Sequence, residues 1–317
     1  LRSQLAEAPD RPLALVLGSS RIAYGMRPAS VTQPRSDDAA EPVFFNLAML
    51  GVGPVGEQLV LHRVVHMGMK PKWLFVEVWP PFLLQFGLIS EQNTIFRRDV
   101  YWSDLPMITR LYDCGTEAAG RVFAESVTPL LHYRTSVLGY YAPDLAQAPL
   151  VVGAEPIERL KECLDGSGWI PFDIDQIDPA ANTAHLDRAR QMIKPLFDGF
   201  HISDISDQAL HALLEECRAH DIKVALFLMP EHSELRKWYP PMQAALTAYL
   251  QRLSEDYQAP VIDARSWCSD DDIPDCCHLS PRGARAFSER FGREVYRPFL
   301  QGQPLAKDIL LRDPALP

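Results

Sequence analysis

The stretch Leu13-Ala-Leu-Val-Leu-Gly-Ser-Ser-Arg-Ile-Ala-Tyr-Gly25 decides the fold of this chain. Its first five residues form a continuous apolar run, which is typical of a strand buried on both faces of a parallel sheet. The run ends at Gly18, and two serines follow, a residue type that is favoured at the start of a helix. The stretch therefore predicts a strand, a tight turn and a helix, which is the opening unit of an α/β fold.

The alternation of apolar runs and amphipathic segments continues along the chain. It predicts further strands at residues 43–47, 73–78, 222–229 and 260–263, and helices at residues 57–67, 207–220, 241–256 and 281–296. Strands that alternate with helices in this way form parallel sheets covered by helices on both faces. We therefore expect a three-layer α/β/α, flavodoxin-like fold with a parallel sheet of about five strands.

The alternation breaks in the middle of the chain, between Pro80 and about His201. Residues 104–112 and 116–131 have helical patterns, whereas residues 143–183 are rich in Pro, Asp and Gly. We expect one domain over residues 1–317, with residues 83–200 as a large, mostly helical insertion that forms a cap or a partner surface. Residues 301–317 contain three prolines and are expected to form a loosely attached tail.

The composition is that of an ordinary globular protein, with 317 residues of which 47% are hydrophobic and 23% are charged. The net charge of −10 and the lack of a basic run argue against a nucleic-acid partner. No apolar run reaches the roughly 20 residues of a membrane-spanning helix. Six cysteines permit disulfides, but their spacings match no zinc motif, so we expect neither a cofactor nor a metal in the functional site.

Side chains suited to nucleophilic acyl chemistry occur at two distant places. Ser20 follows the first predicted strand, and Asp275-Cys-Cys-His278 precedes the last predicted helix. A serine hydroxyl becomes a good nucleophile only when a base lies within hydrogen-bond reach and a third group orients that base. His278 suits the base and Asp275 the orienting carboxylate. Each motif also has a simpler explanation, because Gly-Ser-Ser is a common helix cap and Asp-x-x-His is frequent by chance.

In this order the motifs resemble those of the SGNH or GDSL hydrolase superfamily. Leu17-Gly-Ser-Ser-Arg resembles its first block, Asn46-Leu-Ala-Met-Leu-Gly51 its second, and Asp275-Cys-Cys-His278 its last. The resemblance implies that Ser20 is the nucleophile of a Ser-His-Asp triad. It also implies that the backbone N–H groups of Ser20 and Gly51 stabilise the oxyanion.

The third block departs from the family pattern. The family has Gly-x-Asn-Asp after the third strand, and that asparagine donates to the oxyanion, whereas this strand ends Val76-Glu-Val-Trp-Pro-Pro81. Loss of one oxyanion donor typically lowers turnover about 100- to 1,000-fold. Either another group replaces the asparagine or catalysis is weak. Similar departures occur in divergent, often envelope-associated members that modify cell-surface polymers.

Five further residues are candidates for substrate binding. Arg21 either holds an anionic substrate group or pairs with a surface carboxylate. Glu77 is an acid in a strand predicted to be buried, and Arg21 is one candidate partner for it. Asn46 lies at the end of the second predicted strand, Trp79 follows the third, and His201 lies where the insertion rejoins the core. Packing is the alternative role for Trp79, and a structural role is the alternative for His201.

The sequence thus predicts a serine esterase or O-acyltransferase, of the O-acetyl type, that acts on an acylated glycan or other cell-envelope polymer. The alternative is a weak or inactive module of the same fold that binds a polysaccharide, or an envelope protein through the insertion. A nucleotide-binding protein fits poorly, because Gly51-Val-Gly-Pro-Val-Gly56 only loosely resembles a dinucleotide loop. The chain starts at Leu1 rather than Met, so we expect a removed N-terminal segment and an extracytoplasmic location, periplasmic or membrane-anchored, with the cytoplasm left open.

Overall fold

The computed structural model divides into two compact units, one made of Leu1–Thr94 with Leu164–Pro317 and the other of Ile95–Cys163. It describes residues 1, 5–6, 10–32, 41–85, 87, 91–92, 95, 100–112, 120, 123, 164–172 and 178–312. The second unit is therefore narrower than the insertion expected at residues 83–200, since residues 164–200 group with the first unit.

The described part of the second unit begins with a short 3-10 helix, η1 (Trp102–Asp104), followed by helix α7 (Leu105–Tyr112). These two elements agree with the helix expected at residues 104–112. Apart from residues 120 and 123, the helix expected at residues 116–131 lies outside the described residues, as does most of the irregular segment expected at residues 143–183.

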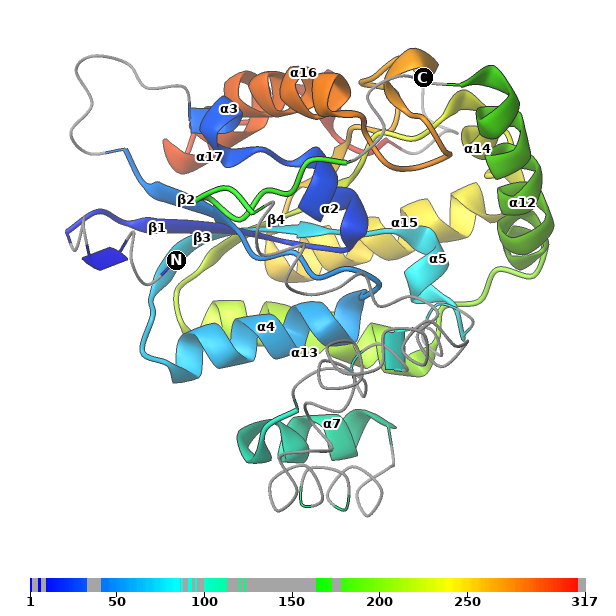
Figure 1. Cartoon of the computed structure of the whole chain (residues 1–317). Coiled ribbons are helices and arrows are strands. Elements are labelled where there is room, and N and C mark those ends of the chain that lie inside the picture. The colour runs from blue at the N-terminus through cyan, green and yellow to red at the C-terminus, as the bar shows by residue number, and fades with distance from the viewer. Residues whose placement is uncertain are drawn as a thin grey trace, which may run out of the picture. The chain divides into compact units, whose positions relative to one another are not determined.

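A five-stranded parallel sheet forms the centre of the first unit (Figure 1). Its strands are β1 (Leu13–Leu17), β2 (Val43–Asn46), β3 (Pro71–Glu77), β4 (Lys223–Leu228) and β5 (Val261–Asp263). The strand order is β2-β1-β3-β4-β5, and every neighbouring pair is parallel. This is the flavodoxin-like order, so the expected fold class is confirmed.

Helices cover both faces of the sheet and complete the three layers (Figure 1). One face packs against α4 (Pro54–His66), α13 (Asp204–Ala219) and α15 (Pro240–Tyr257), and α12 (Pro179–Asp198) contacts α15. The other face packs against α2 (Ser20–Gly25), α3 (Pro28–Thr32) and α16 (Pro281–Phe291). The remaining short elements are α5 (Pro80–Leu83), α14 (Ser233–Arg236), η3 (Asp270–Asp272), η4 (Gly292–Tyr296), α17 (Arg297–Leu300) and η5 (Lys307–Ile309).

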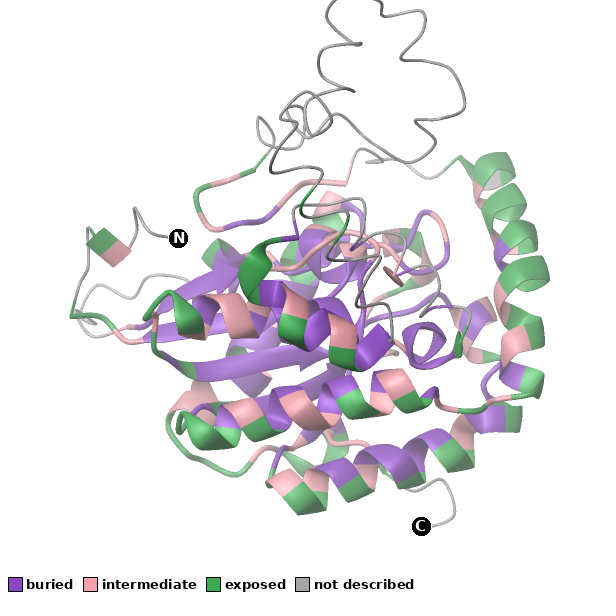
Figure 2. Ribbon diagram, turned by 90° about the horizontal axis from the view of Figure 1, so that it is seen from below, coloured by how far each residue is buried: buried purple, intermediate pink, exposed green. Residues whose placement is uncertain are grey.

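The apolar run of β1 is explained by its position in the middle of these layers. Leu13, Leu15 and Leu17 belong to the core under α4, α13 and α15, whereas Ala14 and Val16 belong to the core under α16. Successive strand residues point to opposite faces, and both faces are covered, so no position in the run tolerates a polar side chain. Figure 2 shows the buried strands between helices whose exposed residues lie on their outer sides.

The helix boundaries follow local signals. Helix α4 begins at Pro54, earlier than expected, because proline suits the first helical turn. It ends just before Gly68, whose φ of +78° is the left-handed conformation expected at that position. The helix expected at residues 281–296 is α-helical only to Phe291 and continues as the π-helical turn η4.

Residues 301–312 are not the loosely attached tail that was expected. Leu310 forms an antiparallel bridge with Ile262, and the backbone N–H of Leu311 donates to the carbonyl of Val261 at 2.8 Å. Ile309 is 2% exposed and belongs to the core under α16. Hydrogen bonding along the open edge of β5 therefore holds this segment, in spite of its prolines.

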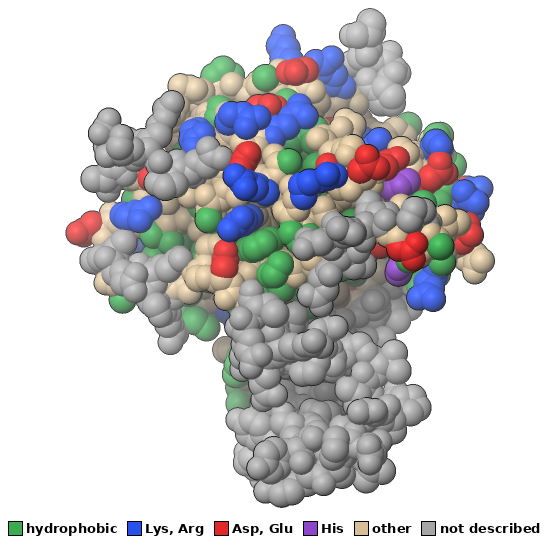
Figure 3. All heavy atoms as spheres, turned by 45° about the horizontal axis from the view of Figure 1, so that its top comes forward, with side chains coloured by type: hydrophobic (Ala, Val, Ile, Leu, Met, Phe, Trp, Pro, Cys, Tyr) green, Lys and Arg blue, Asp and Glu red, His purple; other side chains and the backbone are tan. Residues whose placement is uncertain are grey.

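The face that carries α16 and α17 has many lysine and arginine side chains (Figure 3). On α16, Arg282 pairs with Asp272, Arg285 with Glu289 and Arg290 with Glu294. These arginines therefore have carboxylate partners beside them. Within the part of the chain that the structure describes, no helix is both long and apolar enough to cross a membrane.

Candidate active site

Three side chains form a continuous hydrogen-bonded line at the carboxyl edge of the sheet. The Oγ of Ser20 lies 2.7 Å from Nε2 of His278, and Nδ1 of His278 lies 2.6 Å from Oδ2 of Asp275. Ser20 is the first residue of α2, directly after β1, and the other two residues precede α16, which packs against α2. The expected proximity of Ser20 and His278 is therefore confirmed, although they are separated by 258 positions.

The two adjacent serines have different surroundings. Ser19 caps α2, because its Oγ accepts a hydrogen bond from the backbone N–H of Arg21 at 3.2 Å. The same hydroxyl donates to Oε2 of Glu77 at 2.8 Å, and the backbone N–H of Ser19 donates to that oxygen at 2.8 Å. Ser19 is thus held by the scaffold, and Ser20 is the serine whose hydroxyl meets the histidine.

Asp275 is bound tightly by its own turn. Its Oδ1 accepts the backbone N–H groups of Cys276, Cys277 and His278 at 2.6, 2.9 and 2.8 Å. Burial acts against ionisation of this carboxyl, but the charge of His278 and these hydrogen bonds outweigh it and lower the pKa of Asp275. Asp275 is therefore ionised at neutral pH and presents Oδ2 to the imidazole.

The surroundings of His278 favour its protonated form. Burial opposes its charged form, but the electrostatic effects of Cys277 and Asp275 and the hydrogen bond to Asp275 outweigh burial and raise the pKa of His278 well above its ordinary value of 6.5. The neighbouring Cys277 is a free thiol, and its hydrogen bond with Cys276, together with burial, raises its pKa well above 9.0. Cys277 is therefore neutral at physiological pH, and Asp275 is the anion that stabilises the imidazolium.

Arg21 is a buried anchor and not an exposed binding group. Its side chain is 1% exposed and forms ion pairs of 3.4 Å with both Glu77 and Glu231. Glu231 also accepts a hydrogen bond from the hydroxyl of Tyr239 at 2.8 Å. The expectation that Arg21 holds a substrate anion or a surface carboxylate is therefore corrected: its partners are buried carboxylates, and Glu77 is one of them.

The guanidinium of Arg21 also connects three segments of the site. Its Nε donates to the carbonyl of Cys277 at 3.3 Å, and Nη2 donates to the carbonyls of Met229 and Pro230 at 3.0 Å each. Burial disfavours its charge, but Glu77 and Glu231 outweigh burial and raise the pKa of Arg21. Arg21 thus fixes the start of α2 to the turn that carries Asp275 and His278.

Two backbone N–H groups are expected to stabilise an oxyanion. The N–H groups of Ser20 and Gly51 make no hydrogen bond to any residue that the structure describes. The loop that leads to Gly51 runs beside the end of β1, because the N–H of Met49 donates to the carbonyl of Gly18 at 2.9 Å. Gly51 has a φ of +72°, a conformation that favours glycine.

No asparagine follows the third strand. That position has Trp79 and then two prolines at the start of α5, and proline has no backbone N–H to offer. The guanidinium of Arg21 lies over the ring of Trp79, and its central carbon is 5.2 Å from the centroid of that ring. Its Nε1 is buried, with no acceptor among the described residues.

Two other expected binding residues have different surroundings. Asn46 is buried, and its amide donates to the carbonyls of Ile22 and Met26 at 2.9 and 2.8 Å. It therefore ties β2 to α2 and is not open to a substrate. His201 is exposed in the segment between α12 and α13, and no described contact joins it to Ser20 or His278.

Sequence reasoning missed an aromatic wall beside the histidine. The rings of Tyr24 and Phe172 lie 5.4 and 5.2 Å from the imidazole of His278, and 5.0 Å from each other. Phe172 lies three positions after Trp169, whose Nε1 donates a hydrogen bond of 2.7 Å to the carbonyl of Tyr24 in α2. The sequence Asp-Gly-Ser-Gly at residues 165–168 is typical of a tight turn, and it could have indicated that the segment before Phe172 is ordered.

The fold and the site together define an α/β protein with a Ser-His-Asp arrangement at the carboxyl edge of a flavodoxin-like sheet. No model of a known protein family matches the chain, and a search of curated proteins finds no similar sequence. Inference about function therefore rests on the chemistry of the site.

Proposed function

We propose that the protein is a serine esterase or O-acyltransferase of the SGNH type that acts on an acylated glycan or another acylated cell-envelope polymer. The observation that carries the proposal is the unbroken line from Ser20 Oγ through His278 to Asp275, at 2.7 and 2.6 Å. These are the distances needed for proton transfer from a hydroxyl to an oriented imidazole.

The chemistry follows from this geometry. The Oγ of Ser20 attacks the acyl carbon while its proton passes to Nε2 of His278, and Asp275 stabilises the imidazolium. The backbone N–H groups of Ser20 and Gly51 hold the oxyanion. The imidazolium then protonates the departing alcohol oxygen, which leaves an acyl-serine. Water or a sugar hydroxyl, deprotonated by His278, attacks this intermediate and releases an acid or a new ester.

The aromatic wall of Tyr24 and Phe172 supports a carbohydrate substrate, because sugar rings present C–H faces that pack on aromatic side chains. An acylated envelope polymer is found outside the cytoplasm, so an extracytoplasmic location belongs to the same proposal. The proposal also includes an envelope protein partner, which would bind through the segment expected as an insertion.

A serine-reactive fluorophosphonate probe tests the proposal directly. We expect one-to-one labelling of the native protein at Ser20, located by peptide mass spectrometry, and no labelling of Ser20→Ala or of His278→Ala. Hydrolysis of a small acetyl ester should be lost in the same two variants. A folded native protein that neither reacts with the probe nor cleaves the ester would rule out the enzyme.

A binding or assembly module for a polysaccharide or an envelope partner is the second candidate. The specific observation in its favour is the lack of an asparagine after β3, where Trp79 and two prolines stand instead. Such a module would bind the glycan without reacting with the probe. Glycan binding that is equal in the native protein and in Ser20→Ala, with no labelling of either, would support this alternative.

The pH dependence of ester turnover should reflect the raised pKa of His278. The base must be neutral to accept the serine proton, so kcat/KM should fall as the pH drops through this pKa, with a midpoint above 6.5. Asp275→Asn removes an anion that raises the pKa of His278, so the imidazole of His278 should titrate at lower pH in this variant, as measured by NMR. Ester turnover by the same variant should fall by about 10⁴-fold. A midpoint at or below 6.5 in the native enzyme would contradict this reading.

Phe172→Ala should affect a large substrate more than a small one. Loss of the ring should raise KM for an acylated polysaccharide by about 2- to 10-fold, since one aromatic contact contributes roughly 0.5–1.5 kcal/mol. The same variant should hydrolyse a small acetyl ester at a nearly native rate, and this substrate is the internal control. An equal loss on both substrates would place Phe172 in the support of His278 instead.

A further inference from the structure

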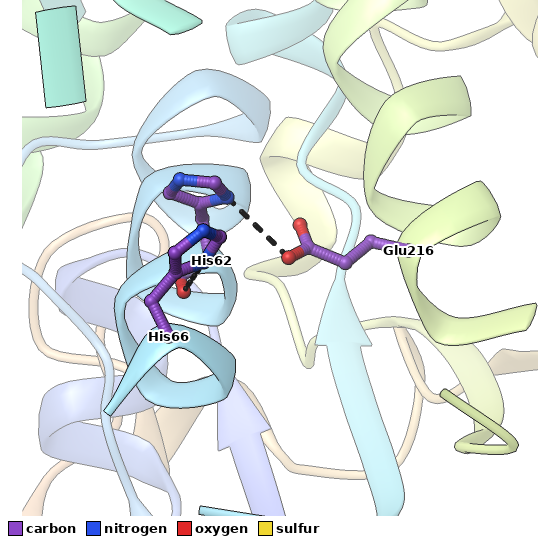
Figure 4. A group of neighbouring side chains, drawn as sticks. All are labelled: His62, His66 and Glu216. Carbon is purple, nitrogen blue, oxygen red and sulfur yellow. Dashed lines mark hydrogen bonds and ion pairs between the residues drawn. The ribbon is translucent and has the colours of Figure 1, made fainter. Parts of the chain in front are cut away.

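A second group of ligand-type side chains lies outside the triad, between α4 and α13. His62 and His66 project from α4, and Glu216 projects toward them from α13 (Figure 4). They belong to the last two turns of these helices. Helices that connect parallel strands run back along the sheet, so these turns lie toward the amino edge, opposite the edge of Ser20.

The spacing of the two histidines brings their rings together. Residues four positions apart lie on the same face of an α-helix, one turn above the other. The ring centroids of His62 and His66 are 3.8 Å apart. This i, i+4 pairing on a rigid helix is the arrangement in which two imidazoles ligate one metal ion. The rings therefore have the relative placement that metal binding needs.

The carboxylate of Glu216 completes a three-ligand set. One ligand atom from each residue lies within 4.8 Å of the other two. The Nδ1 of His62 is 3.4 Å from Oε1 of Glu216. Tetrahedral zinc with bonds of about 2.0–2.2 Å requires ligand atoms roughly 3.3–3.5 Å apart. One edge of the tetrahedron is already at the required length, and the third ligand atom lies within 4.8 Å of the other two.

An outer hydrogen bond orients one of the imidazoles. The Nδ1 of His66 lies 3.0 Å from the backbone carbonyl of His62, and a carbonyl oxygen can only accept, so Nδ1 carries the proton. The lone pair of the neutral ring is therefore on Nε2. A hydrogen bond from a ring N–H to a backbone carbonyl is the usual way in which a protein fixes the tautomer and the orientation of a ligating histidine.

We propose that His62, His66 and Glu216 bind one divalent transition-metal ion of the zinc class, with the fourth position left to water. Two imidazole nitrogens with one carboxylate favour zinc over magnesium or calcium, which prefer oxygen ligands. The ion joins α4 to α13, which pack against each other on the same face of the sheet. Binding of the ion does not depend on the proposed esterase activity.

Zinc titration of metal-free protein tests the proposal by calorimetry and by thermal unfolding. The native chain should bind zinc with a rise in unfolding temperature. Loss of a residue that only hydrogen-bonds to a metal ligand typically lowers metal affinity roughly 10- to 100-fold. His66→Ala and Glu216→Gln each remove a ligand itself, so they should weaken zinc binding by more than this. His66 is exposed, so His66→Ala should unfold at the native temperature without zinc. The matched control is His185→Ala, which removes an exposed histidine of α12 and should bind zinc as the native chain does.

Cobalt substitution separates this site from binding at the cysteines. Cobalt held by imidazole and carboxylate should show weak visible bands that disappear in His66→Ala, without thiolate charge-transfer absorption in the near ultraviolet. The proposal is overturned if the native chain binds no zinc, or if His66→Ala and Glu216→Gln bind zinc as tightly as the native chain. It is also overturned if thiolate absorption accounts for all of the bound cobalt.

Discussion

Ser20→Ala is expected to lower ester turnover by about 10⁴- to 10⁶-fold, as loss of the nucleophile does in serine hydrolases. The hydroxyl is the only group removed, and its one described partner is Nε2 of His278. The free energy of unfolding should therefore stay nearly unchanged. Steady-state hydrolysis of a small acetyl ester measures the first effect, and chemical denaturation measures the second.

Ser19→Ala is the matched control for this variant, because it removes the same hydroxyl one position earlier. It loses the cap of α2 and the hydrogen bond to Oε2 of Glu77. We expect a loss of about 1–2 kcal/mol in unfolding free energy and a much smaller effect on turnover than in Ser20→Ala. The reverse pattern, with Ser20→Ala unstable but active, would mean that Ser20 is a structural residue and Ser19 the reactive one.

Arg21→Met is expected to lower the free energy of unfolding by about 3–5 kcal/mol. The substitution keeps most of the side-chain volume but leaves Glu77 and Glu231 buried without their shared cation. It also releases the carbonyl of Cys277 and so loosens the turn that carries His278. Urea denaturation followed by circular dichroism measures the loss.

Arg21→Lys separates the charge of Arg21 from its hydrogen bonds. Lysine keeps the cation between the two glutamates but cannot reach three backbone carbonyls with a planar fork, so we expect an intermediate stability. Arg282→Ala, at an exposed arginine paired with Asp272, should change stability far less. Equal effects of Arg21→Met and Arg282→Ala would show that the buried network contributes little.

Much of the fold could be predicted from local patterns. The run at Leu13–Leu17 predicted a strand covered on both faces, and alternate residues of β1 do enter two separate cores. Gly68 marked the end of α4 through its left-handed conformation. These signals work because helix and strand periods and glycine conformations are local properties. The prolines of residues 301–317 led to the wrong prediction of a loose tail. Composition does not show that the edge of β5 is open for hydrogen bonding.

The site was predictable only in part. The order of the Gly-Ser-Ser and Asp-x-x-His motifs was enough to predict that Ser20 and His278 meet. It was not enough to show that Arg21 is buried between Glu77 and Glu231, because Glu231 lies in a loop 210 positions away from Arg21 in the numbering. The aromatic ring of Phe172 likewise reaches His278 from a segment that carries no strand or helix pattern.

The sequence by itself therefore determined the strand and helix periods, the turn that ends β1 and the residue types able to form a triad. The tertiary structure alone decided which serine faces the histidine, which carboxylates neutralise Arg21, and which helices bring His62 and His66 to Glu216. The physical reason is that backbone periodicity is set by neighbours in the chain. Partners of buried charges and ligand sets are set by which loops and helices the folded sheet places side by side.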